Sequence, residues 1–287
     1  MKKERIEKAI QLDGKVAVIT GTARQKGIGF ACAKALAMQG ANVVISDLGE
    51  YEENLTDEIY GLGSVAQLQK AVQELEGCGA KAIYVPADMT KQGDRERLIK
   101  TAVETFGRVD ILVNVAAAMF NTTVLNSDRN AWDVSYEVNV KGVIELTRCA
   151  IPYMKQQGGG TVVNISSGVG VGALPGMAPY VCTKHANVAL TKYFAAEYGK
   201  YNIRFNVICP GNTWTENWDE EMAMINRETG KSIEQILEET RRAAWLNKIG
   251  TPMEIGAVAA FLCSPGAGFI NGATVMVDGG SCEGNLH

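Results

Sequence analysis

The chain has 287 residues, of which 46% are hydrophobic and 21% charged, and its formal net charge is −4. This length is sufficient to bury a substantial core, and the composition favours one domain over residues 1–287. A negative net charge provides no basic surface for nucleic acid, so no nucleic-acid partner is predicted. The sequence contains no uninterrupted run of about eighteen apolar residues and no apolar signal segment near its start, which predicts a cytoplasmic protein without a membrane span.

Seven cysteines and two histidines limit the chemistry that the chain can perform. The cysteines form an odd set without a C-x-x-C pair, which argues against a zinc ribbon and a disulfide framework and predicts reduced thiols. The histidines, His185 and His287, are too few for a histidine-rich metal site and poorly suited to a Ser-His-Asp triad. No metal site is therefore predicted.

Short apolar runs rich in β-branched residues recur along the chain, separated by segments with helical periodicity. The predicted strands are 16–20, 43–46, 82–85, 111–115, 161–165, 204–208 and 274–277. The predicted helices are 28–38, 64–75, 93–106, 131–154, 179–198 and 252–262. Because the strand runs are continuously hydrophobic, both faces of each strand are expected to be buried. The pattern predicts an α/β fold in which a Rossmann-like, doubly wound sheet of seven parallel strands is flanked by helices.

A glycine-rich turn joins the first predicted strand to the first predicted helix. Gly21, Gly27 and Gly29 would let backbone N–H groups approach a pyrophosphate at the helix N-terminus, with Ile28 between the last two glycines. Asp47 closes the next apolar run, eighteen residues after Gly29. Its carboxylate would accept hydrogen bonds from an adenosine ribose and repel a 2′-phosphate. The arrangement predicts a dinucleotide site with NAD as the cofactor.

Two alternatives concern residues of the turn itself. A P-loop would need a Lys-Ser/Thr pair after its last glycine, which Ile28 and Gly29 do not provide. Arg24 and Lys26, in contrast, could neutralise a 2′-phosphate and offset the effect of Asp47. An NADPH-preferring ketoreductase therefore remains open.

Two segments are additions to the connections of a minimal sheet of this kind. Residues 49–63 are acidic and turn-rich and follow Asp47 directly, so they are expected to cover the adenosine end of the site. Residues 214–249 separate the sixth strand from the last helix and carry apolar side chains that include Trp214 and Trp218. Because insertions at the carboxyl ends of parallel strands lie beside the ligand crevice, this second segment is predicted to be a substrate lid. An amphipathic surface helix is the alternative.

Tyr180 and Lys184 are four residues apart in the predicted helix 179–198, so their side chains share one face. An ammonium beside a phenol favours the phenolate and lowers the phenol pKa from about 10 towards neutral pH. Such a tyrosine can act as a general base. The alternative is a solvated pair on a helix surface.

From Lys15 to Gly280 the sequence resembles the short-chain dehydrogenase/reductase family. The resemblance rests on the glycine-rich turn, Asn-Val-Lys-Gly at 139–142, Asn-Ile-Ser-Ser at 164–167, Tyr-x-x-x-Lys at 180–184 and Val-Asp-Gly-Gly at 277–280. Counting thirteen residues back from the tyrosine selects Ser167 over Ser166. The glycine-rich turn departs from the family pattern, because five residues separate its first two glycines where three is usual.

The resemblance implies specific roles for residues along the chain. The implied catalytic residues are Asn139, Ser167, Tyr180 and Lys184. The cofactor-binding residues, those of the turn included, are Gly21, Gly27, Ile28, Gly29, Asp47, Asp88, Met89, Asn114, Tyr180, Lys184, Pro210, Gly211, Thr213 and Thr215. Two departures stand among them: the family's usual Asn-Asn-Ala-Gly is Asn-Val-Ala-Ala at 114–117, and Thr213 replaces a common valine.

The resemblance also implies a mechanism. Tyr180 takes the hydroxyl proton while hydride leaves the substrate carbon for the nicotinamide, and Ser167 hydrogen-bonds the substrate oxygen. Lys184 holds the cofactor ribose as well as lowering the pKa of Tyr180, and Asn139 positions a water that joins Lys184 to solvent. The expected activity is hydride transfer between NAD(H) and a secondary alcohol or ketone. Family members commonly assemble through their long helices, which implies a homo-oligomer, a dimer or a homotetramer.

Two other functions remain open. A catalytically silent member would bind the dinucleotide as a redox sensor or scaffold, although such a protein has no need of a titratable phenol. A serine hydrolase would need a histidine base for Ser167, and His185 lies on a different helical face from the catalytic pair. The sequence does not identify the substrate, because residues 214–249 suggest an apolar wall whereas Arg241 and Arg242 could anchor a carboxylate.

Overall fold

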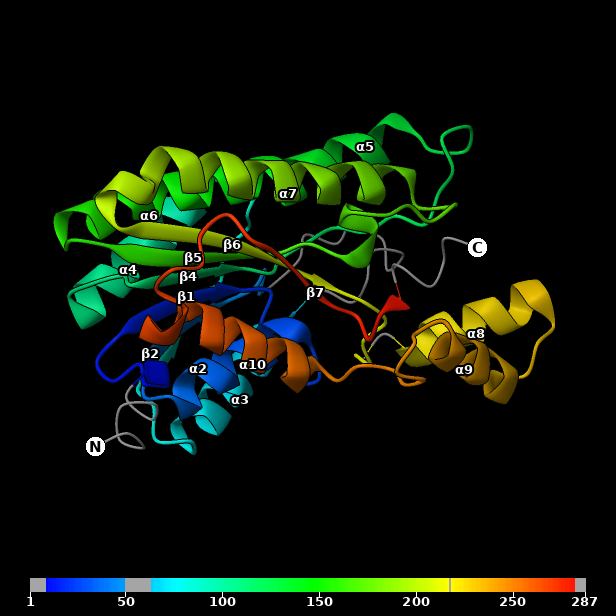
Figure 1. Ribbon diagram of the computed structural model, residues 1–287, viewed down its shortest axis with the longest axis horizontal. Coiled ribbons are helices and arrows are strands. Elements are labelled where there is room, and N and C mark those ends of the chain that lie inside the picture. Colours follow the sequence, from blue (N-terminus) through cyan, green and yellow to red (C-terminus); the bar gives the residue numbers. More distant parts are fainter. Residues whose placement is uncertain (1–8, 50–62, 217, 282–287) are drawn as a thin grey trace.

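The computed structural model describes residues 9–49, 63–216 and 218–281, in which strands and helices alternate along the chain (Figure 1). The strands are β1 (Val16–Thr20), β2 (Asn42–Ser46), β3 (Ala82–Tyr84), β4 (Ile111–Asn114), β5 (Gly160–Ile165), β6 (Ile203–Pro210) and β7 (Thr274–Val277). The helices are α2 (Ile28–Met38), α3 (Val65–Glu76), α4 (Gln92–Phe106), α5 (Arg129–Tyr136), α6 (Val143–Gln156), α7 (Ala178–Tyr198), α8 (Trp218–Thr229), α9 (Ile233–Arg242) and α10 (Pro252–Cys263).

All the strands belong to one parallel sheet with the order β3-β2-β1-β4-β5-β6-β7. The chain runs outwards from β1 to β3 and then returns to place β4 on the other side of β1. Right-handed crossovers in these two directions put helices on opposite faces of the sheet. The predicted doubly wound, seven-stranded fold is confirmed, and the continuous hydrophobic runs are explained by burial of every position of β1.

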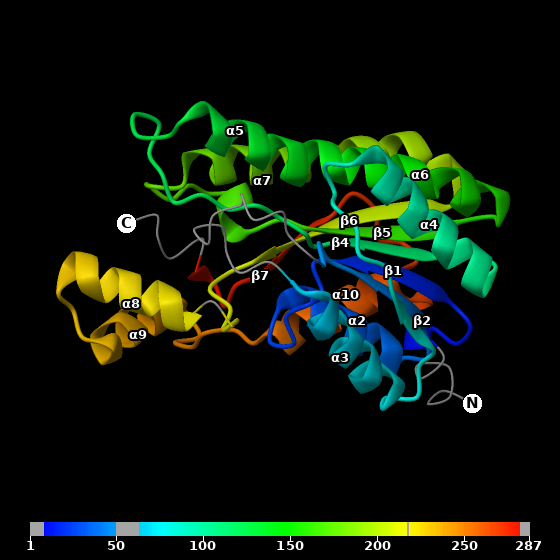
Figure 2. The same ribbon diagram turned by 180° about the vertical axis from the view of Figure 1, so that it is seen from behind.

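Each face of the sheet carries its own hydrophobic core. On one face α2, α3 and α10 pack against the strands, with Leu36 and Ile255 among the buried side chains. On the other face α4, α6 and α7 cover the sheet, with Leu98 and Phe194 in the core. Figures 1 and 2 show these two helical layers from opposite sides. Helices therefore cover both faces of the sheet and leave the ends of its strands accessible to ligands.

The predicted helix 131–154 is not a single α-helix. It comprises α5 and α6 with a π-helical segment, Glu137–Gly142, between them. A π-helical turn contains an extra residue, and such turns are rare and concentrated at functional sites. Asn139, which the family resemblance identifies as catalytic, lies inside this segment.

The predicted lid, residues 214–249, contains a helical hairpin. Its helices α8 and α9 extend from the sheet at the carboxyl ends of the strands (Figure 1). They bury a small cluster of their own, formed by Trp218, Met222 and Ile236. The hairpin is therefore held together largely by its own side chains. Most of the other predicted insertion, residues 50–62, lies outside the described residues.

Among the described residues, no helix combines the length and the apolar composition that crossing a membrane requires. In the same part of the chain, no three His, Cys, Asp or Glu side chains come together in a way that could hold a metal ion.

Candidate active site

A cavity of about 490 Å³ opens at the carboxyl ends of the strands. Its walls come from the loops after β1 to β4, from α5 and α7, and from the loop before α8. The predicted cofactor residues that line it are Gly21, Gly27, Ile28, Gly29, Asp47, Asp88, Met89, Tyr180 and Thr215. This is the edge at which parallel α/β sheets bind ligands.

The turn after β1 forms one wall of this cavity with its backbone. Gly21 has a φ of +69°, and a Cβ added there would lie 2.9 Å from the backbone nitrogen of Ala116. A Cβ added at Gly29 would overlap the carbonyl oxygen of Gly21. Gly27 caps α2 without a side-chain acceptor among the described residues, so the first N–H groups of the helix are left for another partner. A pyrophosphate fits this cradle, because its negative charge satisfies those donors.

The end of β2 carries the groups that would meet an adenosine ribose. Asp47 Oδ2 accepts the Ala23 N–H at 2.9 Å, and Oδ1 accepts the Leu48 N–H at 2.9 Å. Each carboxylate oxygen keeps a second lone pair for a ligand. The buried hydroxyl of Ser46 lines the same wall and has no hydrogen-bond partner within the described chain, which fits a polar ligand group. Arg24 also lines the cavity, whereas Lys26, the other basic residue expected to affect a 2′-phosphate, does not.

The loop after β3 is held in shape by its own polar side chains. Asp88 Oδ1 accepts the Thr90 N–H at 2.8 Å and the Thr90 hydroxyl at 2.7 Å. The Asp88 N–H donates to Asp94 Oδ2 at 2.9 Å. These bonds order the loop, and Asp88 and Met89, both predicted to bind the cofactor, line the cavity.

Tyr180 lies in the first turn of α7, where it lines the cavity and is half-buried. Lys184, one turn further along, is only 2% exposed. Its Nζ donates to the Ile165 carbonyl oxygen at 2.9 Å and lies 5.3 Å from the centre of the Tyr180 ring. Burial lowers the pKa of Lys184 to about 8, because an ammonium removed from water loses its hydration. The phenol and the amine are thus brought together at the cavity.

The two serines at the end of β5 have different surroundings. Ser166 is buried, and its hydroxyl donates to the Lys184 carbonyl oxygen at 2.9 Å. Ser167 is half-buried and extended, and its hydroxyl oxygen accepts the Val169 N–H at 3.4 Å. That long contact leaves the Ser167 hydroxyl proton for a ligand. The position selected by counting back from the tyrosine is therefore the more accessible one.

Asn139 is buried and its side-chain amide is fully used. Its Oδ1 accepts the Ala118 N–H at 2.7 Å, while its Nδ2 donates to the Ala118 carbonyl at 2.8 Å and to the Thr183 hydroxyl at 3.0 Å. The side chain thus ties the π-helical segment to the loop after β4 and to α7. That Asn139 positions a water stays a prediction.

Comparison with known proteins shows to which family the chain belongs. A sequence model described as Enoyl-(Acyl carrier protein) reductase matches residues 21–282. The human protein Dehydrogenase/reductase SDR family member 4 is 35% identical over 271 residues, which cover 94% of this chain and 88% of that protein. This chain belongs to the short-chain dehydrogenase/reductase family.

Two reductases illustrate the activities found among proteins similar to this chain. The A-factor type gamma-butyrolactone 1′-reductase of Streptomyces virginiae is 38% identical over 271 residues, covering 94% of this chain and 96% of that protein. The crystal structure of L-sorbose reductase from Gluconobacter frateurii, complexed with NADPH and L-sorbose, matches with a TM-score of 0.86 and 29% identity over 96% of this chain and 99% of that chain. The chain is accordingly a dehydrogenase/reductase of a family that binds a nicotinamide dinucleotide. Its oligomeric state and cellular location stay predictions.

Asn114, predicted to bind the cofactor, has its side chain inside the fold. It is 5% exposed, and its Nδ2 donates to Asn164 Oδ1 at 2.8 Å across neighbouring strands β4 and β5. It does not line the cavity. The side chain of Asn114 therefore joins strands, and a direct contact with the cofactor is not supported by its placement.

The loop after β6 contributes to the cavity through Thr215, while Pro210, Gly211 and Thr213 do not line it. The Thr213 hydroxyl donates to the Gly211 carbonyl at 2.9 Å, and the Thr213 carbonyl accepts the Trp218 indole N–H at 2.6 Å. These bonds fold the loop and connect it to α8. The three residues thus support Thr215, and their own contact with a cofactor stays a prediction.

Met119, Val134 and Val138 are among the lining residues that the sequence did not identify as site residues. They form an apolar wall in the same cavity as Tyr180. A sequence signal existed for two of them, because Val134 and Val138 are four residues apart and share one helical face. The other predicted catalytic residues, Ser167, Lys184 and Asn139, lie outside the lining set and are connected to it through β5, α7 and the π-helical segment.

Proposed function

We propose that this chain transfers a hydride between a nicotinamide dinucleotide, preferentially NAD(H), and a secondary alcohol or ketone, with Tyr180 as the general acid/base. The observation that carries the proposal is the placement of Tyr180 in the same cavity as the glycine cradle, with the buried Lys184 beside its ring. A protein that only bound dinucleotide would not require this pair.

The nicotinamide ring, when bound, supplies the hydride acceptor or donor. The chain's own residues move the proton: in oxidation the Tyr180 phenolate accepts the substrate hydroxyl proton, and in reduction the phenol returns it to the carbonyl oxygen. Charged Lys184 stabilises the phenolate. Ser167 donates a hydrogen bond to the substrate oxygen, on which negative charge develops in the reduction.

Asp47 supports NAD as the preferred cofactor, because its carboxylate lies at the adenosine end and would repel a 2′-phosphate. Arg24, in the same wall, favours the second candidate, an NADPH-preferring ketoreductase. The L-sorbose reductase relative was crystallised with NADPH. We base the preference for NAD on Asp47, because a backbone N–H fixes each of its two carboxylate oxygens at the adenosine end.

Replacing Asp47 by asparagine should shift the ratio of NADPH to NADH affinity towards NADPH by about tenfold or more, or about 1.4 kcal/mol. Asparagine keeps one oxygen acceptor for the turn but removes the charge that repels the phosphate. The affinities are to be measured by titration of both reduced cofactors. The proposal of NAD preference is contradicted if the unmodified protein already binds NADPH more tightly.

The apolar wall of Met119, Val134 and Val138 supports substrates that carry an apolar group next to the reacting carbon. A panel of ketones and secondary alcohols, followed at the reduced-nicotinamide absorbance band, should show turnover with some of these compounds. Removing the dinucleotide should abolish all activity, which would not be so for a serine hydrolase. Stoichiometric binding of dinucleotide without turnover across the panel would instead support a silent binder.

A further inference from the structure

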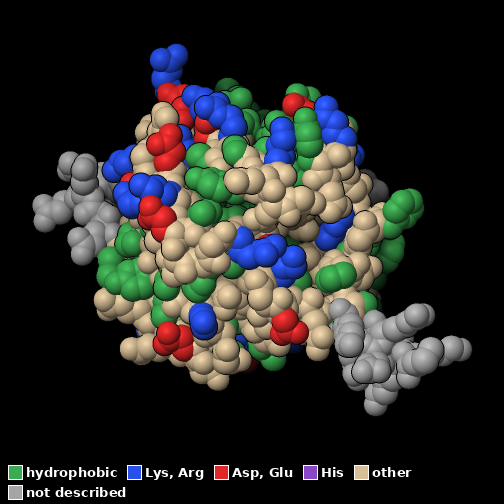
Figure 3. All heavy atoms as spheres, turned by 90° about the vertical axis from the view of Figure 1, so that its left-hand side faces the viewer, with side chains coloured by type: hydrophobic (Ala, Val, Ile, Leu, Met, Phe, Trp, Pro, Cys, Tyr) green, Lys and Arg blue, Asp and Glu red, His purple; other side chains and the backbone are tan. Residues whose placement is uncertain are grey.

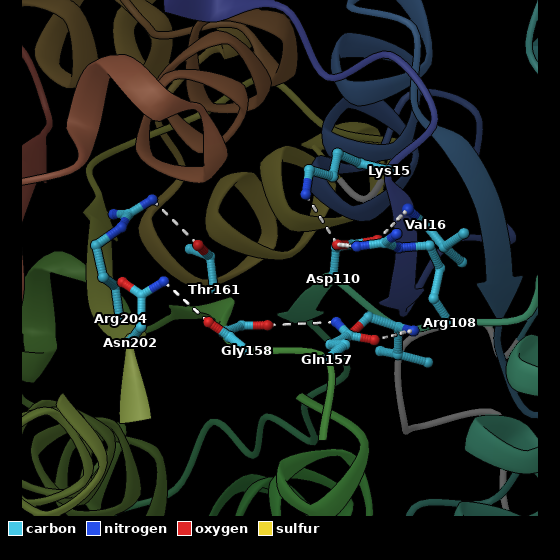
Figure 4. Close-up of polar contacts among 11 residues, drawn as sticks. Lys15, Val16, Arg108, Asp110, Gln157, Gly158, Thr161, Asn202 and Arg204 are labelled. Atoms are coloured by element: carbon cyan, nitrogen blue, oxygen red, sulfur yellow. Dashed lines mark hydrogen bonds and ion pairs between the residues drawn. The ribbon is translucent and has the colours of Figure 1, made fainter. Parts of the chain in front are cut away.

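A second cavity, of about 280 Å³, lies at the other end of the sheet, away from the dinucleotide site. Its walls come from segments at the amino ends of β1, β4, β5 and β6 and from the end of α10. Figure 3 looks onto this end of the molecule, where Lys and Arg side chains gather near the centre of the face. Figure 4 shows the polar residues that surround the cavity, among them Lys15, Arg108, Asp110 and Arg204.

The charges around this cavity do not cancel. Lys15, Arg108 and Arg204 contribute three positive charges, and Asp110 contributes one negative charge. The excess of positive charge is opposite in sign to the net charge of the whole chain, which is −4. A concave site lined by one sign of charge concentrates small ions of the other sign.

Asp110 carries a single negative charge and forms ion pairs with two cations, Lys15 and Arg108. Its two oxygens accept Arg108 Nε and Nη2 at 2.6 Å each, Lys15 Nζ at 3.1 Å and the Val16 N–H at 3.0 Å. Burial raises the pKa of Asp110, but these hydrogen bonds outweigh it and hold the pKa below its ordinary value. A carboxylate offers about four acceptor sites. The remaining N–H groups of Lys15 and Arg108 are therefore left for another acceptor.

Among the described residues, the guanidinium of Arg204 donates hydrogen bonds to neutral acceptors only. Its guanidinium donates to the carbonyl oxygens of Leu262 at 2.8 Å, Ile270 at 3.2 Å and Ser264 at 3.3 Å, and to the Thr161 hydroxyl at 3.1 Å. Burial lowers the pKa of Arg204, since its charge is partly removed from water. A partly buried cation without a counter-charge is costly, and an anion in the cavity would offset that cost.

We propose that this cavity binds a small anion carrying two negative charges, such as a phosphoryl group or a dicarboxylate. The anion would accept hydrogen bonds from Lys15 and Arg108 and neutralise the field of Arg204. Two negative charges match the excess of positive charge, and the volume suits a small molecule. The site is separate from the dinucleotide cavity, with which it shares no lining residue.

The test is isothermal titration with inorganic phosphate and, separately, with malonate, at constant ionic strength maintained with chloride. A saturating reduced dinucleotide is present throughout, so that the pyrophosphate cradle is blocked. The unmodified protein should bind at least one of the two anions with a Kd of about 1 mM or tighter. Binding of phosphate alone identifies phosphoryl ligands, and binding of malonate alone identifies dicarboxylates.

Lys15→Gln and Arg108→Gln should each weaken that binding about tenfold, the effect of losing one charge-assisted hydrogen bond. In the Lys15→Gln protein the introduced side chain still offers an amide donor to Asp110, and Lys15 is 43% exposed, so this variant should fold normally. Arg148→Gln is the matched control, because Arg148 is an exposed cation paired with Glu145 outside the cavity. Absence of anion binding, or equal affinity in the Lys15→Gln and Arg148→Gln proteins, would overturn the proposal.

Discussion

Replacing Tyr180 by phenylalanine should lower kcat roughly 100- to 10,000-fold, the range expected when a general acid/base is removed. Phenylalanine keeps the ring that lines the cavity but has no proton to exchange with the substrate oxygen. Dinucleotide affinity should change little, because the glycine cradle and Asp47 are untouched. Turnover of the best substrate from the panel and fluorescence titration of the reduced dinucleotide measure the two quantities separately.

Tyr193→Phe provides the control for this substitution. Tyr193 lies on the same helix, α7, but it is 61% exposed and does not line the cavity. The same loss of a hydroxyl should therefore leave kcat unchanged. A Tyr180→Phe protein that binds dinucleotide and retains full turnover would rule out Tyr180 as the acid/base and would require another residue as the base.

The sheet could be predicted from the sequence because its central strands, β1, β4 and β5 among them, are buried on both faces. Such strands appear as continuous apolar runs, and this signal does not depend on which strands are neighbours. The glycine-rich turn could also be predicted from the sequence. Gly21 and Gly29 lie where a Cβ would meet backbone atoms, so glycine itself marks these positions. Both signals are local, so each can be recognised in the sequence without knowledge of the tertiary structure.

The π-helical segment could not be predicted in the same way. Periodicity over 131–154 favours one continuous helix, whereas the structure has a π-helical segment at Glu137–Gly142, in which Asn139 makes hydrogen bonds with Ala118 and Thr183. These partners are 21 and 44 residues away in the sequence. Periodicity reports only local spacing and contains no information on such tertiary hydrogen bonds.

Asn114 shows the corresponding limit for a site residue. It is the last residue of β4, and its amide donates a hydrogen bond to Asn164, while Asn114 does not line the cavity. Residues alternate between the faces of a strand, so a shift of one position changes which face a side chain occupies. The second cavity has no comparable signal in the sequence, because Lys15 and Asp110 are 95 residues apart and neither belongs to a motif.

Burial of the charged Lys184 side chain at the proposed catalytic centre lowers the stability of the folded protein. Burial lowers its pKa from 10.5 to about 8, a difference that corresponds to about 3 kcal/mol. Below pH 8 the amine is protonated in both folded and unfolded chains, and the folded state bears the whole penalty of the buried charge. Between pH 8 and 10.5 the unfolded chain binds more protons, so the free energy of unfolding rises with pH as this penalty disappears.

Replacing Lys184 by methionine should therefore stabilise the protein while inactivating it. The gain below pH 8 is expected to be about 2 kcal/mol, because loss of the hydrogen bond to the Ile165 carbonyl subtracts about 1 kcal/mol from the relieved penalty. The gain should shrink from pH 8 to 10.5, and kcat should fall about 100-fold or more, since the phenolate of Tyr180 loses its neighbouring charge. Denaturant unfolding across this pH range, with the exposed Lys192→Met on the same helix as control, measures the effect. A Lys184→Met protein that is less stable than the unmodified one at about pH 7, or whose stability difference does not vary with pH, would show that Lys184 is not a strained buried cation.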